Sequence, residues 1–363
     1  MYRCVFLIFT ILSLNSYGFN YSQNEINQFN KNTQNKQLSK EFVLEFFTSN
    51  DPVQFIDDHI KESKNPLLLE YQLYQLLNEV SYQTKQDFLQ KFVGQMKAYK
   101  TQAHKIHDEG RVPVPIFNIH AKAVGIENIW LASDAFVYYQ RSFAQDSIAA
   151  LLDLKDSLPS LRQPEWFGLK KSITTINPEN QDLMTAYLLE DSKNLIGLDK
   201  FVAHYALFTA NQELTELALQ NLDKSNSEYL LRNLNKYFDK SFVMEQLIAA
   251  VEGDKNANFA ISMMVAHIDE KQIEAKLFSL LVDEKHSKQA AMALAYLEKE
   301  SSIMNMQTLF IQSDSEQVKK QITFALKMNH HPSAHVVLEQ ILKTHDNDLQ
   351  TDKWLGSFNG EIQ

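Results

Sequence analysis

The chain has 363 residues, with 45 acidic and 35 basic side chains and a formal net charge of −10. Duplex nucleic acid is an unfavourable partner for such a chain, because its binding requires clustered Lys and Arg side chains and no lysine-rich block occurs. The chain has a single cysteine, Cys4, so an internal disulfide, a cysteine zinc site and a Cys-x-x-Cys redox site are excluded.

The first eighteen residues have the layout of a secretory signal peptide. Arg3 supplies a positive charge, residues 4–14 form a run of about eleven mostly apolar residues, and Ser16 and Gly18 place small residues where a signal peptidase cleaves. The run is too short to span a bilayer; a buried N-terminal strand or helix is the alternative interpretation. We expect residues 1–18 to be removed near Gly18, which gives a periplasmic or secreted product that begins near Phe19.

Removal of this segment leaves about 345 residues without a cysteine, and the loss of Arg3 takes the net charge to −11. A chain of that length exceeds the usual size of one compact core, so we expect either two domains or an elongated array. No second long apolar run occurs, so no transmembrane segment is expected after the signal is removed.

Residues 19–40 are rich in Asn, Gln, Ser and Lys and are expected to form a flexible polar leader. Residues 41–192 then form an irregular helical N-terminal region. Its predicted helices are at 41–49, 52–62, 66–82, 85–108, 134–157, 165–176 and 178–191.

Prolines mark several of the predicted helix starts. In Asp51-Pro52, Asn65-Pro66 and Asn177-Pro178, a residue that can cap a helix precedes a proline at the first helical position. Proline suits that position because its missing N–H would have no partner in the first turn. The pattern predicts an all-α fold.

The segment 193–345 repeats every thirty residues. Units that begin at Gly197, Ser227, Ala257 and Ser287 align without a gap, and their first helices share columns at i, i+3, i+4 and i+7, as on one face of an α-helix. These columns are Phe201, Leu231, Ile261 and Ala291; His204, Leu234, Met264 and Leu294; Tyr205, Asn235, Val265 and Ala295; and Phe208, Phe238 and Ile268, with Glu298 as an exception.

The second helices carry apolar columns of their own. Val243, Leu247, Ala250 and Val251 align with Ile273, Leu277, Leu280 and Leu281, and the columns continue with Ile303, Phe310 and Ile311, with Gln307 as an exception. In the first unit the pattern slips by one residue, to Leu214, Leu217, Ala218 and Leu222. A hairpin of two helices, each about 18 Å long, cannot bury such stripes alone, so consecutive units must cover one another. The remaining residues, 346–363, are expected to form a C-terminal tail.

These columns resemble HEAT repeats, in particular the short form with units of about thirty residues. The resemblance implies a right-handed α-solenoid of stacked helical hairpins, preceded here by the less regular N-terminal half. It further implies a role in binding or scaffolding, with the second helices lining the concave face.

The densest polar cluster contains His104, His107 and His120, beside Asp108 and Glu109. On a helix through residue 108, His104 and His107 at i, i+3 share one face, which is a usable spacing for metal ligands. Neutral imidazoles with a carboxylate can hold zinc and leave a position for water. Ordinary stabilisation of a helix C-terminus by cations is the alternative interpretation.

Six large aromatic residues lie between 117 and 143, where the repeat is absent. Aromatic side chains often anchor protein partners, so Phe117, Trp130, Tyr138 and Tyr139 are candidate partner-binding residues. The alternative is that they form the core of a helical cap.

The sequence contains no G-x-S-x-G, Walker or G-x-G-x-x-G signature, and no cofactor is expected. We predict an exported binding or scaffolding module for a protein or peptide of the cell envelope, without catalysis. Two alternatives remain: a periplasmic metal-dependent hydrolase that uses the three histidines, and a structural spacer.

Overall fold

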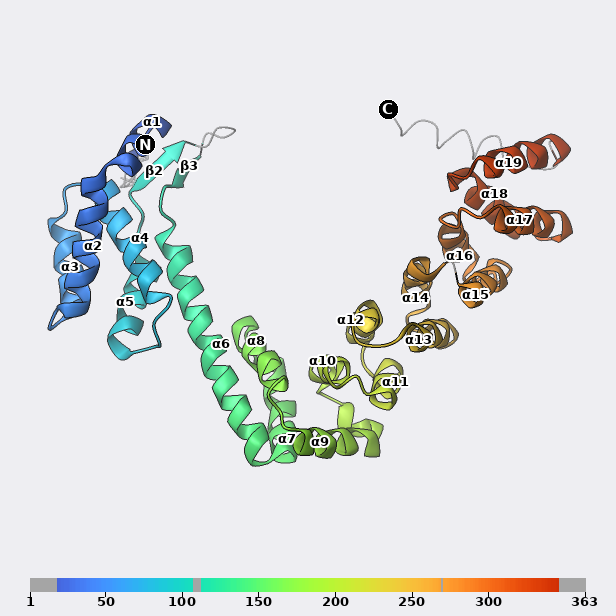
Figure 1. Cartoon of the computed structure of the whole chain (residues 1–363), viewed down its shortest axis with the longest axis horizontal. Helices are drawn as coiled ribbons and strands as arrows, with labels where there is room; N and C mark the ends of the chain where they lie inside the picture. The colour runs from blue at the N-terminus through green and yellow to red at the C-terminus, as the bar shows by residue number, and fades with distance from the viewer. Residues whose placement is uncertain (1–17, 107–111, 269, 346–363) are drawn as a thin grey trace, which may run out of the picture. The chain divides into compact units, whose positions relative to one another are not determined.

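The fold is built almost entirely from helices (Figure 1), and the computed structural model describes residues 18–106, 112–268 and 270–345. The internal contacts divide the chain into two units. The first contains the described residues up to Arg141 together with Leu161–Ser172, and the second contains Ser142–Ser160 and the described residues from Ile173 onward.

The first unit contains seven helices among its described residues. They are α1 (Gln23–Lys31), α2 (Thr33–Thr48), α3 (Pro52–Glu62), α4 (Pro66–Val80), α5 (Asp87–Ala98), the part of α6 (Ile119–Gln145) up to Arg141, and α8 (Gln163–Ile173). Helix α2 packs against α3 and α4, and α3 packs against α5. Their shared core is apolar and includes Phe46, Leu73, Phe92 and Ile126.

Capping by side chains fixes the helix starts that the prolines predict. Asp51 accepts a hydrogen bond from the Gln54 N–H (3.1 Å) directly before Pro52, which is the first residue of α3. Asn65 and Asn177 cap α4 and α9 (Pro178–Glu190) in the same way. Each cap satisfies a backbone N–H that has no partner within the helix. These three predicted helix starts are confirmed.

The segment expected to be a flexible leader is structured instead. Ser22 and Glu25 form a reciprocal capping box at the start of α1, and Asn32 caps α2. Ile26 is buried, and the Phe29 ring packs edge-on against Tyr71 at 5.5 Å. A polar composition therefore concealed two capped helices, because a few apolar residues at the correct spacing are enough to attach a polar helix to a core.

The predicted helix 85–108 is shorter than expected, and a small sheet follows it. Helix α5 ends at Ala98, and Ala103–Ile106 form strand β2. Strand β1 (Phe19–Asn20) pairs with β2 in parallel, and β3 (Pro113–Pro115) pairs with it in antiparallel register. Both prolines of β3 are at the edge of the sheet, the position where strands tolerate proline.

The second unit continues as a series of short helices. These are α7 (Ser147–Ser157), α9, α10 (Asp199–Thr209), α11 (Gln212–Asn221), α12 (Lys224–Asn233), α13 (Lys240–Glu252), α14 (Ala257–Met264), α15 (Lys271–Leu281), α16 (Ser287–Leu294), α17 (Glu300–Gln312), α18 (Glu316–Met328) and α19 (Pro332–His345). Short 3-10 turns adjoin several of them, at Leu158–Ser160, Ser192–Leu195, Leu234–Lys236 and Val265–His267.

From α10 onward the helices pack against their neighbours in two rows (Figure 1). The first-helix row runs through α10, α12, α14, α16 and α18, and each of these helices contacts the next in the row. Each second helix, α11, α13, α15 and α17, also contacts the first helix that follows it. This order of contacts is compatible with a helical repeat fold.

Burial follows most of the predicted columns. Phe201, Leu231, Ile261 and Ala291 are all buried, as are Leu234, Met264 and Leu294 of the next column. Two residues depart from the pattern. Asn235 lies in a 3-10 turn and is exposed, and Ile311 is 65% exposed at the end of α17.

Polar contacts also connect positions thirty residues apart. The Gln246 side chain donates to Glu216, Lys240 pairs with Glu270, and Gln317 donates to Ser287. Equivalent positions of neighbouring units therefore meet through polar as well as apolar side chains. Within the described part of the chain, no helix is both long and apolar enough to cross a membrane.

Candidate functional site

Two histidines of the predicted metal cluster, His104 and His120, lie in different elements, and His104 is not in a helix. His104 is in strand β2, where its Nδ1 lies 3.0 Å from the Gln102 carbonyl oxygen. His120 is in the first turn of α6, with its Nδ1 2.7 Å from the Lys97 carbonyl oxygen. His107 lies outside the described residues. Because α5 ends at Ala98, the helical i, i+3 spacing on which the site was based is wrong.

The described residues contain no group of three or more His, Cys, Asp or Glu side chains that could hold a metal ion. The imidazoles of His104 and His120 instead each have a ring nitrogen at hydrogen-bonding distance from a backbone carbonyl. That contact requires the Nδ1 atom to carry the proton. Each of these two rings thus has a structural partner.

Two of the four candidate partner-binding aromatics belong to the core of the first unit. Trp130 is 5% exposed, and its indole N–H donates to the Gln83 carbonyl oxygen at 3.1 Å. Phe117 is half-buried and packs against Tyr71 and Tyr74, with ring centroids 5.7 Å apart in both pairs. For these two residues the geometry matches the interpretation as a helical core.

The other two aromatics adjoin each other on α6. Tyr139 is 6% exposed and Tyr138 is 59% exposed, and their rings meet edge-to-face at 5.0 Å. They contribute to a shallow hollow of about 310 Å³ between α6 and α8, which Asp134 and Glu165 also line. Both carboxylates are already in ion pairs, with Lys85 and Arg162. Tyr138 is therefore the only one of the four predicted residues with an exposed ring.

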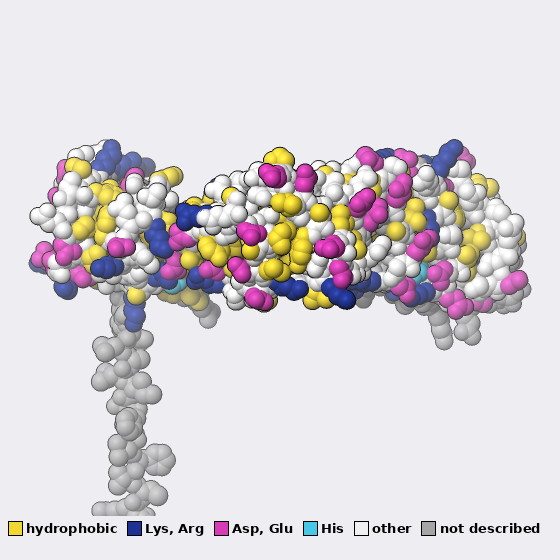
Figure 2. Space-filling model, turned by 90° about the horizontal axis from the view of Figure 1, so that it is seen from below, with side chains coloured by type: hydrophobic (Ala, Val, Ile, Leu, Met, Phe, Trp, Pro, Cys, Tyr) yellow, Lys and Arg dark blue, Asp and Glu magenta, His cyan; other side chains and the backbone are white. Residues whose placement is uncertain are grey.

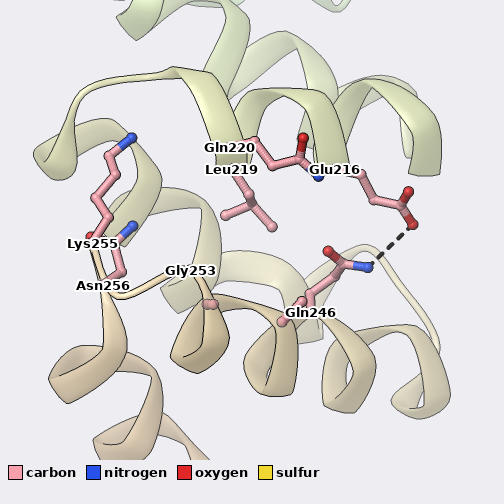
Figure 3. A pocket seen from close by; sticks show the side chains of 9 residues that line it. Glu216, Leu219, Gln220, Gln246, Gly253, Lys255 and Asn256 are labelled. Carbon is pink, nitrogen blue, oxygen red and sulfur yellow. Dashed lines mark hydrogen bonds between the residues drawn. The ribbon is translucent and has the colours of Figure 1, made fainter. Parts of the chain in front are cut away.

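A second hollow lies in the second unit, between helices α11 and α13 (Figure 3). We call it the α11–α13 pocket, and its volume is about 350 Å³. It is lined by Glu216, Leu219, Gln220, Gln246, Ala249, Ala250, Gly253, Lys255 and Asn256. Both helices are second helices of the sequence repeat. Glu216 of α11 and Gln246 of α13 are thirty residues apart in the sequence.

Polar groups are at both ends of the α11–α13 pocket, and Leu219, Gln220 and Gly253 lie between them (Figure 3). At one end the Gln246 amide donates to the Glu216 carboxylate at 3.2 Å. At the other end are Lys255 and Asn256. The Lys255 ammonium donates to the Leu222 carbonyl at the end of α11. This hydrogen bond connects two consecutive thirty-residue repeats.

Asn256 has a polar atom that the fold does not use. The residue is at the N-cap position of α14 but makes no capping hydrogen bond. It is 5% exposed, and its Oδ1 has no hydrogen-bond partner among the described residues. A buried amide oxygen without a partner costs free energy, and asparagine is normally among the best capping residues. An amide acceptor is thus held beside the pocket without a structural partner.

No sequence motif marks these pocket residues. Glu216 and Gln246 are thirty residues apart in the sequence, as are Gln220 and Ala250. Polar residues at such positions are equally typical of solvated helix surface, because their burial depends on the width of the groove between neighbouring helices. Comparison with protein-family models, curated proteins and solved structures finds no match to this chain.

Proposed function

We propose that the protein is an exported binding module, a right-handed α-solenoid of HEAT-like repeats that holds a peptide segment of a cell-envelope protein. The export rests on the signal-like layout around Arg3, residues 4–14 and Gly18. The solenoid rests on the thirty-residue columns, their burial and the chain-order packing of α10 to α19.

The α11–α13 pocket is the proposed binding site, and the single observation that carries it is the unpartnered amide oxygen of Asn256. Because that oxygen is itself buried, the Asn256 side chain must turn toward the pocket before a peptide N–H can donate to it, and each peptide unit has an N–H donor as well as a carbonyl acceptor. The amides of Gln220 and Gln246 provide further donors and acceptors, and Leu219 and Ala249 provide apolar contact. A volume of about 350 Å³ is at the lower end of ligand pockets, which suits a short peptide segment.

The charge distribution favours this class of partner over nucleic acid. The chain is acidic, and acidic and basic side chains are interspersed over the face seen in Figure 2. Binding to a polyanion requires basic groups that follow the phosphates. A peptide requires only local polar complementarity.

A pocket-filling substitution tests the proposal. Protein beginning at Phe19 is incubated with an array of immobilised hexapeptides, alongside the variants Ala249→Trp and Ala275→Trp. Ala249 lines the pocket, whereas Ala275 is an exposed alanine of α15 outside it. We expect Ala249→Trp to lower the affinity for the bound peptides at least tenfold. Ala275→Trp should leave that affinity unchanged.

Two outcomes contradict the proposal. If both variants, folded by circular dichroism, retain the wild-type pattern, peptides bind elsewhere. If the wild-type protein binds no peptide on the array, the structural-spacer alternative replaces the binding module.

A further inference from the structure

The first described residues are fixed to the first unit by strand pairing. The Phe19 N–H donates to the Gln102 carbonyl oxygen at 2.7 Å, and the Tyr21 N–H donates to the His104 carbonyl oxygen at 2.8 Å. These bonds place β1 parallel to β2, with Phe19 opposite Ala103. The chain is therefore already a part of the sheet at the first residue that follows the predicted cleavage point.

Gly18 approaches the same strand too closely for any side chain. A Cβ atom at Gly18 would lie 2.3 Å from His104 Nδ1 and 2.9 Å from the Gln102 carbonyl oxygen. Both distances are well inside van der Waals contact, so only glycine fits there without movement of the sheet. The peptide bond between Gly18 and Phe19 is thus at the edge of a packed structure.

A buried carboxylate lies on the other side of Gln102. Glu70 of α4 is 0% exposed, and its Oε1 accepts hydrogen bonds from the N–H groups of Gln102 (2.5 Å) and Ala103 (3.1 Å) and from the Tyr99 hydroxyl (3.4 Å). Its Oε2 has no hydrogen-bond partner among the described residues. Gln102 therefore contacts both groups: its carbonyl oxygen accepts from the Phe19 N–H, and its own N–H donates to Glu70.

Among the described residues, the groups that act on the Glu70 carboxyl include no cation. Burial raises the pKa of its carboxyl to about 7, against the opposing effect of the hydrogen bonds from Gln102, Ala103 and Tyr99. A buried charge is costly unless an opposite charge lies nearby. A positive group at this end of the sheet would favour the ionised carboxylate.

We propose that the mature N-terminus is this positive group: the α-ammonium of Phe19, docked in the sheet, is the counter-charge of Glu70. The inference rests on the export proposed above. Hydrolysis of the Gly18–Phe19 bond adds a hydroxyl from water to the Gly18 carbonyl carbon and leaves the nitrogen of Phe19 protonated. One N–H of the new ammonium keeps the bond to Gln102, and two further donors are available at the same position.

A cycle of four proteins tests the charge pairing. Chains that begin at Phe19, with either a free or an acetylated α-amine, are prepared with Glu70 or with Glu70→Gln. We expect the free amine to raise the melting temperature of the Glu70 protein by about 2–4 °C over its acetylated form. The same comparison in Glu70→Gln should give no difference. Glu79→Gln, which removes an exposed carboxylate from the same helix, should retain the full difference.

The pKa of the α-amine gives a readout that a purely structural effect would not change. In NMR titrations with a labelled Phe19, the pKa of the α-amine should lie above the ordinary 7.7–8.0 in the protein that has Glu70. In the Glu70→Gln protein this pKa should return to the ordinary range. Tyr21, Tyr99 and His104 face the same end of the sheet, and Glu25 acts on Tyr21. Equal pKa values in the two proteins would overturn the pairing.

The cleavage has its own test, so the two failures are distinguishable. N-terminal sequencing of the exported protein should begin at Phe19. A different first residue contradicts the proposed cleavage. If acetylation changes the melting temperature equally with Glu70 and with Glu70→Gln, only the pairing of the amine with Glu70 is contradicted.

Discussion

The indole N–H of Trp130 donates to the backbone carbonyl oxygen of Gln83 at 3.1 Å and thereby joins helix α6 to the loop between α4 and α5. The ring is 5% exposed and belongs to the core that includes Leu77, Phe92 and Ile126. This contact distinguishes a structural aromatic from the exposed Tyr138 two turns further along the same helix.

We predict opposite consequences for these two aromatics. Trp130→Ala should lower the free energy of unfolding of the first unit by about 3–5 kcal/mol, the usual result of truncating a buried aromatic residue. Tyr138→Ala should change it by less than about 1 kcal/mol. Urea unfolding followed by tryptophan-independent far-ultraviolet circular dichroism measures both. Equal losses for the two variants would show that the assignment of Trp130 to the core is incorrect.

The repeat columns make a second prediction about stability. Leu277 is fully buried in α15, so Leu277→Asp should place an unpaired charge among apolar side chains and cost several kcal/mol. Ala275→Asp, at an exposed position of the same helix, should cost about 0.5 kcal/mol. Thermal melts compare the two variants with the wild type.

Lys276 is a poorer control at this position, although it also lies off the apolar column. Its ammonium pairs with Glu252 at 2.8 Å, so an acidic replacement would add repulsion. If Ala275→Asp and Leu277→Asp melt at the same temperature, the columns do not describe the core.

Local chemistry made part of this fold predictable. A capping residue followed by proline identifies the starts of α3, α4 and α9 because both residues act on the first turn, within a few positions in sequence. The column through Phe201 and Ile261 predicts burial for a similar reason, since the same contact recurs in each unit.

Contacts between distant segments were beyond such reasoning. Strand β1 exists because Phe19 meets Gln102, more than eighty residues later in the chain, and no periodicity records that pairing. The burial of Trp130 depends likewise on a loop carbonyl 47 residues away. Ile311 follows its apolar column and is nevertheless exposed near the C-terminal end of α17, which packs against α18 and α19.

The metal-dependent alternative predicts a response to chelators. We expect EDTA to leave the melting temperature of protein that begins at Phe19 unchanged, because the His104 and His120 rings already contact backbone carbonyls in different elements. A bound zinc ion would stabilise the folded chain by mass action, and its removal would lower the melting temperature. Metal analysis that finds one zinc per chain, lost in His107→Ala, would restore the hydrolase hypothesis.

The last prediction concerns His267, which is buried in the second unit with neither ring nitrogen hydrogen-bonded to a described residue. Burial lowers the pKa of this imidazole below 6.5, and the Lys240 ammonium lowers it further, against a smaller opposite effect of Glu270. The unfolded chain therefore binds a proton at a higher pH than the folded chain does. Stability attributable to His267 is complete above pH 6.5 and is lost as the pH falls from 6.5 toward the folded pKa.

His267→Phe should remove that part of the pH dependence, since no group remains there to be protonated. His335→Phe, at an exposed position of α19, is the matched control and should retain the wild-type profile. Melting temperatures recorded from pH 8 to pH 5 should fall less steeply for His267→Phe than for the other two proteins. Parallel profiles for all three would mean that the imidazole is protonated as readily in the folded chain as in the unfolded one.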